Sequence, residues 1–163
     1  MSSRADLKTR RSGPPAPASP RGCTNLKLRQ LGRRVSQHYD RIVGTAGLKT
    51  SQYSLLSHIV TLGPIRPGDL AGHMEMDAST LTRNLQPLVA QGWVEVGPGD
   101  DGRSRLVTAT DAGRGKRVQA QREWKRAQLS LNDKLGIERV AQLHAQIDEC
   151  LALMNQEPGD TDE

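Results

Sequence analysis

Between residues 67 and 110, apolar residues first recur with the spacing of a helix and then alternate with polar residues, as in a β-strand. This change of period limits the folds that the chain can adopt. Pro67 suits the first turn of a helix, where its missing N–H costs nothing, so a short helix is predicted over Pro67–His73. After a turn, Asp77 is a good N-cap for a second helix that runs to about Gln91. The buried face of this second helix is predicted from helical spacing, and its members are Leu81, Leu85, Leu88 and Val89.

A β-hairpin is predicted directly after the second helix. Gly92 ends the helix, and Trp93–Val96 then reads as a strand. The loop Gly97–Ser104 is rich in glycine and aspartate, and Arg105–Thr110 alternates apolar and polar residues as a returning strand does. Thr110 or Asp111 can cap the helix that follows.

The flanking segments are helical, with apolar residues on narrow stripes. Gly47 is expected to end the first helix and Thr50 to cap the next, while Gly136 separates the last two helices. The apolar stripes are Leu28, Leu31, Val35, Tyr39 and Ile42; Tyr53, Leu56 and Val60 with Leu55 and Ile59; Trp124, Ala127, Leu131 and Leu135; and Val140, Leu143, Ile147, Leu151 and Met154. The stripes of the terminal helices are long and narrow, and a narrow stripe usually meets another helix, here one of a second chain.

This order of elements predicts a mainly α protein with a small β-hairpin, that is, a winged helix-turn-helix. The helix-turn-helix is expected over about residues 66–91 and the wing over about 93–109. The helices over about 24–46 and 111–154 are expected to dimerise the protein. Residues 1–22 are predicted to be a disordered basic tail rich in proline and serine, and residues 155–163 a flexible acidic tail.

The positive charge is concentrated in the first tail. The whole chain has a net charge of +5, but residues 1–22 hold five basic residues against one acidic residue, Asp6. The rest of the chain is therefore nearly neutral, and any contact with nucleic acid must come from individually placed side chains. Aromatic residues make up only 2% of the chain, which argues against base-stacking modules.

Several classes of protein are excluded by what the sequence lacks. It has only two cysteines, no apolar run long enough for a membrane span and no signal-peptide pattern, so a cytoplasmic protein without a membrane partner is predicted. The four histidines show no metal-ligand spacing, and neither a phosphate-binding loop nor a nucleophile motif is present. No metal, cofactor or enzymatic activity is expected.

The stretch DASTLTRNLQPLVAQGWVEVGPGDDGRSRLVTATDAG, residues 77–113, resembles the MarR-type transcriptional regulators. That family shows S-T-x-T-R-x-L-x-x-L, then a glycine and a short strand, D-x-R, and a strand ending in T-x-x-G. The resemblance covers about residues 23–154. It implies a homodimer that binds a pseudo-palindromic operator on double-stranded DNA, usually as a repressor released by a small ligand or an oxidant. Pro87 inside the recognition helix and Gly102, where arginine is common, depart from the pattern.

The residues expected to contact DNA lie on the second short helix and on the wing. Hydroxyl, amide and guanidinium groups bind phosphates and base edges, so they suit this role, although an isolated helix could carry them as a solvated face. Asp101 can brace Arg103, whose guanidinium would enter a minor groove; a simple charged turn is the alternative. The candidates are Ser79, Thr80, Thr82, Arg83, Asn84, Asp101, Arg103 and Arg105.

Two further sets are candidates for sensing a signal. Cys23, at the start of the first helix, and Cys150, in the last, would both lie in the dimerisation region, and one branch of the family senses peroxides with a cysteine near the first helix. The resemblance also implies an effector pocket there, for which His38, Tyr39, His58 and Trp124 are candidates. Ordinary free cysteines and core aromatics are the alternatives. A winged helix that contacts only other proteins is the alternative function, favoured by the nearly neutral folded part.

Overall fold

The computed structural model describes residues 21–99 and 104–155, and these form six α-helices, a short 3-10 helix and two strands. The predicted order of elements, and with it the winged helix-turn-helix class, is confirmed. The elements are α1 (Thr24–Val43), η1 (Gly44–Ala46), α2 (Thr50–Leu62), α3 (Pro67–His73), α4 (Ala78–Ala90), β1 (Val94–Pro98), β2 (Arg105–Ala109), α5 (Asp111–Leu135) and α6 (Ile137–Met154).

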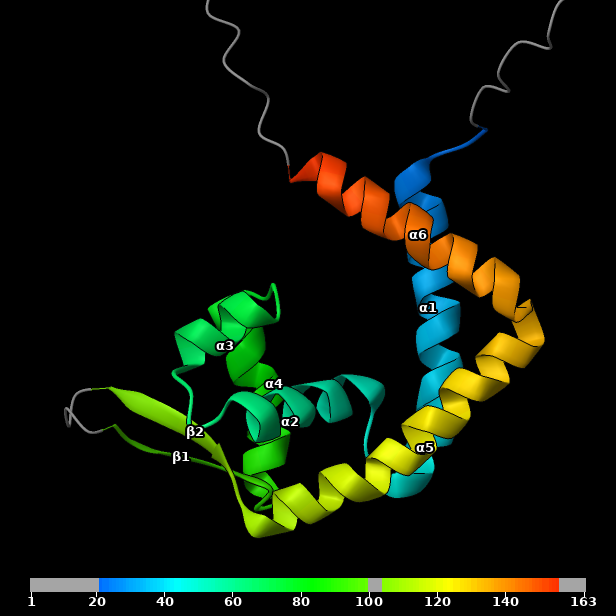
Figure 1. Ribbon diagram of the computed structural model, residues 1–163. Coiled ribbons are helices and arrows are strands. Elements are labelled where there is room, and N and C mark those ends of the chain that lie inside the picture. The colour runs from blue at the N-terminus through cyan, green and yellow to red at the C-terminus, as the bar shows by residue number, and fades with distance from the viewer. Residues whose placement is uncertain (1–20, 100–103, 156–163) are drawn as a thin grey trace, which may run out of the picture.

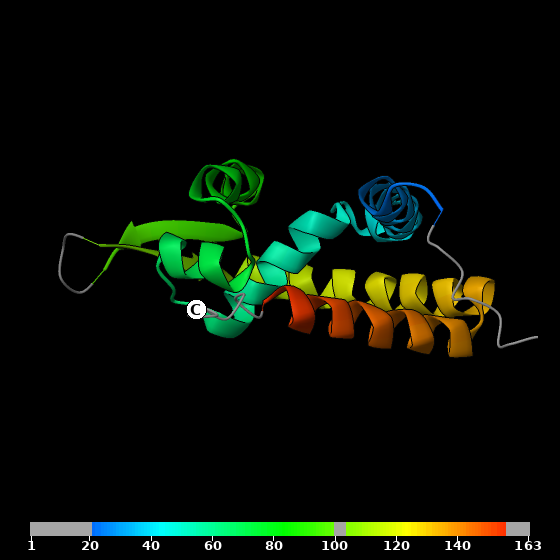
Figure 2. The same cartoon turned by 90° about the horizontal axis from the view of Figure 1, so that it is seen from above.

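The molecule has two parts joined by the long helix α5. Figure 1 shows α2, α3, α4 and the hairpin together on one side, and α1, α5 and α6 on the other. In Figure 1, α5 and α6 diverge from the turn that joins them, and in the view from above α1 is seen nearly end-on, beside the layer that contains both of them (Figure 2). The hairpin projects away from the helical part. The chain therefore presents a helix-turn-helix and its wing at one end and three long helices at the other.

One hydrophobic core holds the helix-turn-helix and the hairpin on α2 and α5. Val107 in the middle of β2 is fully buried, and its backbone also exchanges two hydrogen bonds with Ile65, which precedes α3. The hairpin is thus tied to the helix-turn-helix by backbone as well as by side chains. The largest side chains that are almost completely buried are Val43, Leu55, Leu56, Ile59, Leu70, Leu81, Leu88, Val94 and Val107.

Local sequence signals set most of the element boundaries. Helix α3 begins at Pro67 as predicted, and Thr110 caps α5 by accepting a hydrogen bond from the backbone N–H of Gly113 at 3.0 Å. Asp77 occupies the N-cap of α4, although its side chain makes no capping hydrogen bond. Gly92 takes a left-handed conformation with φ of 68°, which glycine adopts without strain, directly after α4.

Two predictions about α2 and α4 are wrong. Thr50 is the first residue of α2 rather than its cap; the N-cap position belongs to Lys49, and the Thr50 N–H donates to Asp40 Oδ1 at 2.7 Å. Val89 is 41% exposed rather than part of the buried face of α4. It lies about 100° from Leu88 around the helix axis, at the edge of the buried face rather than in its middle.

The long helices leave much of their apolar surface uncovered. In α1 the N-terminal part of the predicted stripe is exposed, including Leu28 at 57%, while Tyr39 further along is buried. In α6 only Val140 is buried, and Met154 is 82% exposed. Packing within one chain therefore accounts for only one end of each stripe. Among the helices that the structure describes, none has the length and apolar character needed to cross a bilayer.

Candidate nucleic-acid interface

Helix α4 has one face in the core and one face open to solvent. Leu81, Leu85 and Leu88 are buried against α2, α3 and the hairpin. The opposite side carries polar side chains and one arginine, and Pro87, Val89 and Ala90 are also exposed toward the C-terminal end of the helix. The residues of this open face, spaced by three, one and three, are Ser79, Thr82, Arg83 and Gln86, and all four are exposed. The buried leucines fix α4 on the core, while the polar residues on its other face remain accessible to a ligand.

The five residues predicted on α4 do not all face outward. Ser79 and Arg83 are exposed, and Thr82 is exposed with its hydroxyl donating to the Ala78 carbonyl at 2.8 Å, so its oxygen can still accept a bond. Thr80 and Asn84 are half-buried. The Asn84 amide nitrogen lies 3.9 Å from the sulfur of Met76, which directs it toward the turn between α3 and α4.

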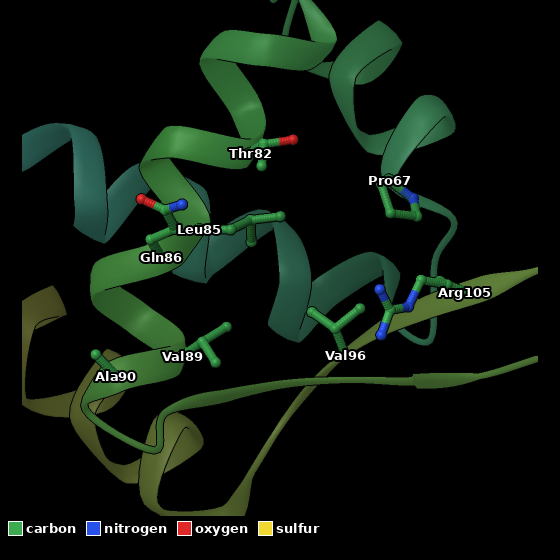
Figure 3. A pocket seen from close by; sticks show the side chains of 8 residues that line it. All are labelled: Pro67, Thr82, Leu85, Gln86, Val89, Ala90, Val96 and Arg105. Atoms are coloured by element: carbon green, nitrogen blue, oxygen red, sulfur yellow. The ribbon is translucent and has the colours of Figure 1, made fainter.

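A groove separates α4 from the hairpin, with a cavity volume of about 470 Å³. Figure 3 shows the α4 side chains along one wall and Arg105, from β2, extending from the other. Arg105 is exposed, and among the described residues that line this groove it is the one that is charged. The described lining residues are Pro67, Thr82, Leu85, Gln86, Val89, Ala90, Val96 and Arg105.

The tip of the wing lies outside the described residues, so Asp101 and Arg103 have no described position. The base of the loop is defined: the Gly99 N–H donates to the Ser104 carbonyl at 2.8 Å. Of the three wing candidates, Arg105 is therefore the one with a described position, and it lies beside the recognition-helix face.

Gln86 is a site residue that the sequence prediction missed. It lies four residues after Thr82 and three after Arg83, so it shares their side of the helix. The signal that identifies it in the sequence is its position outside the leucine stripe, on the same side as Thr82 and Arg83. The exposure of Val89 has no comparable signal, because local spacing does not reveal how far the hairpin covers α4.

The four candidates for an effector pocket do not line one common cavity. His38 Nε2 is 3.2 Å from the Ala127 carbonyl, and the Tyr39 hydroxyl donates to Gln128 Oε1 at 2.5 Å, so both contact α5. Burial raises the pKa of the Tyr39 phenol above its ordinary value. Trp124 packs on Tyr53, with ring centroids 6.2 Å apart.

Two cavities include members of this set. His38 lines one of about 370 Å³ between α1 and α5, together with Leu31, Arg34, Val35, Leu131, Lys134 and Leu135. His58 lines another, of about 330 Å³, together with Ser57, Thr61, Leu62 and His73. Tyr39 and Trp124 line neither of these two cavities. The structure therefore does not bring the four candidates into a single pocket.

The two cysteines are exposed free thiols. Cys23 occupies the N-cap position of α1, and Cys150 lies in the last turns of α6. Both belong to the part of the molecule made of long helices, as predicted. Their exposure leaves each thiol accessible to an oxidant or to another thiol.

Comparison with known proteins finds relatives that share the arrangement described above. Residues 46–104 match the model of the MarR family. YwoH of Bacillus subtilis, described as an uncharacterized HTH-type transcriptional regulator, is 30% identical over 84 residues, which are 52% of this chain and 61% of YwoH. The chain thus spans less than two thirds of the length of this curated relative.

Similar solved structures cover most of the chain. The Mycobacterium tuberculosis transcriptional regulator MosR, solved in complex with DNA, is 28% identical and has a TM-score of 0.68, covering 83% of this chain and 100% of MosR. A mutant MarR from Escherichia coli complexed with operator DNA shares the fold at 23% identity, with a TM-score of 0.71 and coverage of 78% and 92%. A probable transcriptional regulator from Pseudomonas aeruginosa shares it at 22% identity, with a TM-score of 0.70 and coverage of 77% and 95%.

These matches agree with the motif in residues 77–113 and with the order of helices and strands around it. MarR-family members are transcriptional regulators rather than enzymes, which agrees with the prediction of no enzymatic activity. Residues 46–104 thus match the MarR family model, and the described part of the chain has the fold of the solved regulators with which it was compared.

Proposed function

We propose that this protein is a homodimeric, sequence-specific regulator that binds double-stranded DNA with α4 in the major groove. The observation that carries the proposal is the polar outer face of α4, fixed by three buried leucines on its inner face. A major groove admits a helix of this size, and Arg83 can donate two hydrogen bonds to a guanine. Thr82 and Gln86 can bind base edges or phosphates.

The groove beside α4 suits the sugar-phosphate backbone. Its described walls are largely apolar, and the one charge among the residues that form them is the guanidinium of Arg105. A phosphate strand that passes between a recognition helix and a wing would meet this guanidinium, while the sugars would meet Pro67 and Val96. MosR, a relative 28% identical to this chain, has been solved in complex with DNA.

The uncovered stripes on the long helices support a homodimer. Leu28 on α1 and Leu151 on α6 are both more than half exposed in the single chain. Burial of such residues against a second copy yields about 25 cal/mol for each Å² of apolar surface. A two-fold dimer would then place two copies of α4 on one side of the DNA, which matches a pseudo-palindromic operator.

Release of DNA by a signal completes the proposal, with repression as the mode of regulation. The cavity between α1 and α5 has apolar walls and two cations, Arg34 and Lys134, so it suits a small amphipathic anion. The exposed thiols of Cys23 and Cys150 suit an oxidant. Either signal would act by changing the separation of the two recognition helices.

Selection of bound duplexes from a random pool tests the proposed DNA binding. The expected result is a palindrome with half-sites about 34–36 Å apart, and an affinity that falls steeply as the salt concentration rises. A pool with no enriched sequence, and an affinity that salt does not change, would instead favour the winged helix as a protein–protein contact module.

Oxidation has a separate test on a non-reducing gel. If Cys23 and Cys150 pair between subunits, peroxide produces a covalent dimer and lowers operator affinity. The band should be absent in Cys23→Ser and in Cys150→Ser alike. An unchanged gel with unchanged affinity would remove the oxidant from the proposal and leave DNA binding unaffected.

A further inference from the structure

Two histidines from different helices line one cavity that the proposed DNA interface does not use. His58 belongs to α2, whose other side packs in the core, and His73 is the last residue of α3. The cavity has a volume of about 330 Å³ and is otherwise lined by Ser57, Thr61 and Leu62. Its lining residues come from the second half of α2 and from the end of α3, two helices that Figure 1 shows in the same part of the molecule.

The ring of His58 is oriented as a metal-binding imidazole is. Its Nδ1 is 2.8 Å from the Ser54 carbonyl oxygen, one turn earlier in α2. A carbonyl oxygen only accepts, so Nδ1 carries the proton and the lone pair is on Nε2. Histidines that bind metals almost always donate their other ring N–H to a carbonyl or carboxylate in this way.

The remaining groups suit a hydrated ion. The Thr61 hydroxyl donates to the Ser57 carbonyl at 2.9 Å, so its oxygen can accept a hydrogen bond from a water on the metal. His73 is exposed at the end of α3, so its ring can turn without disturbing the core. Within residues 21–99 and 104–155, no cluster of three or more histidine, cysteine, aspartate or glutamate side chains could hold a metal. The protein would thus supply two ligands and water the others.

We propose that His58 and His73 form a two-histidine site for a late divalent transition metal such as Zn²⁺, with water completing the coordination. Imidazole ligands suit zinc, copper and nickel, whereas magnesium and calcium need oxygen ligands. The bound ion would connect α3 to α2. This site is independent of the proposed DNA binding.

The test is calorimetric titration of the full-length, untagged chain with Zn²⁺ at neutral pH, in a Cys23→Ser/Cys150→Ser background that removes both thiols. One zinc ion should bind per chain. His58→Ala and His73→Ala should each lower the affinity by about tenfold or more, since even loss of a second-shell partner costs that much. His144→Ala, which removes an exposed histidine on α6, is the matched control and should bind as the parent does.

A melting experiment gives a second readout. An ion that binds only the folded chain stabilises it, so Zn²⁺ should raise the melting temperature of the parent and of His144→Ala. Zn²⁺ should not raise the melting temperature of His73→Ala. Because His73 is exposed, this variant is expected to fold, so it tests the proposal even if His58→Ala does not fold. Equal zinc binding in His73→Ala and the parent would overturn the proposal. The proposal would also be overturned if His73→Ala lost zinc binding while a folded His58→Ala bound zinc with the affinity of the parent.

Discussion

At the scale of single residues, Arg83 and Arg105 carry the same charge in different surroundings. Arg83 lies on the open face of α4, whereas Arg105 lies on β2 across an apolar groove. Arg83→Ala should cost on the order of 1–3 kcal/mol of operator binding per site and relax the preference at one base pair. Arg105→Ala should lower the affinity for all duplexes by a similar factor, and it should reduce the salt dependence of binding by about one counterion per site. Binding titrations against operator and random duplexes measure both.

Arg122→Ala is the control for these two variants, because Arg122 is an exposed arginine on α5 away from the groove. It should bind every duplex as the parent does. If Arg105→Ala changed preference at one base pair and left the salt dependence unaltered, the assignment of Arg105 to phosphate would be wrong.

Tyr39 links the packing of α1 on α5 to pH. Burial raises its pKa above the ordinary 10.0, and its neutral hydroxyl donates to Gln128. Below pH 10 the phenol is protonated in both the folded and the unfolded state, so it adds no pH dependence. Above pH 10 the unfolded state ionises first, and the free energy of unfolding therefore falls as the pH rises.

Tyr39→Phe should be less stable than the parent at pH 7, by about 1 kcal/mol for the lost hydrogen bond. Its stability should then fall less between pH 10 and pH 11. Urea unfolding of both proteins, at one protein concentration and across this range, measures the difference. If the free energies of unfolding of the two proteins fell in parallel up to pH 11, the Tyr39 phenol would not contribute to the pH dependence of stability.

At the scale of elements, the joint between the hairpin and α5 depends on a glycine without a side chain. A Cβ on Gly113 would overlap the carbonyl oxygen of Trp93, which already accepts the Thr110 N–H at 3.1 Å. Because the obstacle is backbone, Gly113→Ala must displace the hairpin or the start of α5. We expect a loss of about 1–3 kcal/mol of stability, with weaker operator binding because the wing moves.

Gly115→Ala, two residues further along α5, is the matched control for this joint. A Cβ there meets nothing within 4 Å, and alanine is favoured over glycine within a helix by about 0.5–1 kcal/mol. The melting temperature should therefore rise for Gly115→Ala and fall for Gly113→Ala. A rise for both would show that the joint can yield without cost.

The elements were predictable because their signals are local. Pro67, Gly92 and Thr110 fix boundaries through their own backbone or side-chain chemistry, and the leucine stripe of α4 fixes its buried face. Other outcomes depend on distant partners. Thr50 was expected to cap α2, but Asp40, ten residues earlier, receives its N–H. The exposure of Val89 depends on how far the hairpin covers α4.

The candidate site was predictable in part for the same reason. The open face of α4 follows from helical spacing, which identified Ser79, Thr82 and Arg83. Spacing did not show that Asn84 turns toward Met76, nor that Arg105 comes to lie beside α4. Both depend on how the turn and the hairpin pack on the core, which no local pattern contains.

For the molecule as a whole, the proposed function requires a dimer, whose interface would be formed by the exposed apolar stripes of α1 and α6. Leu28 on α1 is 57% exposed and Leu151 on α6 is 51% exposed. A glutamate at either position would place a charge in a desolvated interface and oppose association. Leu28→Glu and Leu151→Glu should therefore sediment as monomers. Val118→Glu, on α5 at 49% exposure but outside the stripes, should remain a dimer.

The monomeric variants also separate dimerisation from base reading, because each keeps an intact α4. Two linked half-site contacts bind more tightly than one by about 10²–10⁴-fold when the geometry allows both. Leu151→Glu should therefore lose affinity for the full palindrome by about this factor and bind an isolated half-site as the parent does. Fluorescence anisotropy on the two duplexes measures both values. A monomer that still bound the palindrome at parental affinity would show that one α4 reads the operator alone.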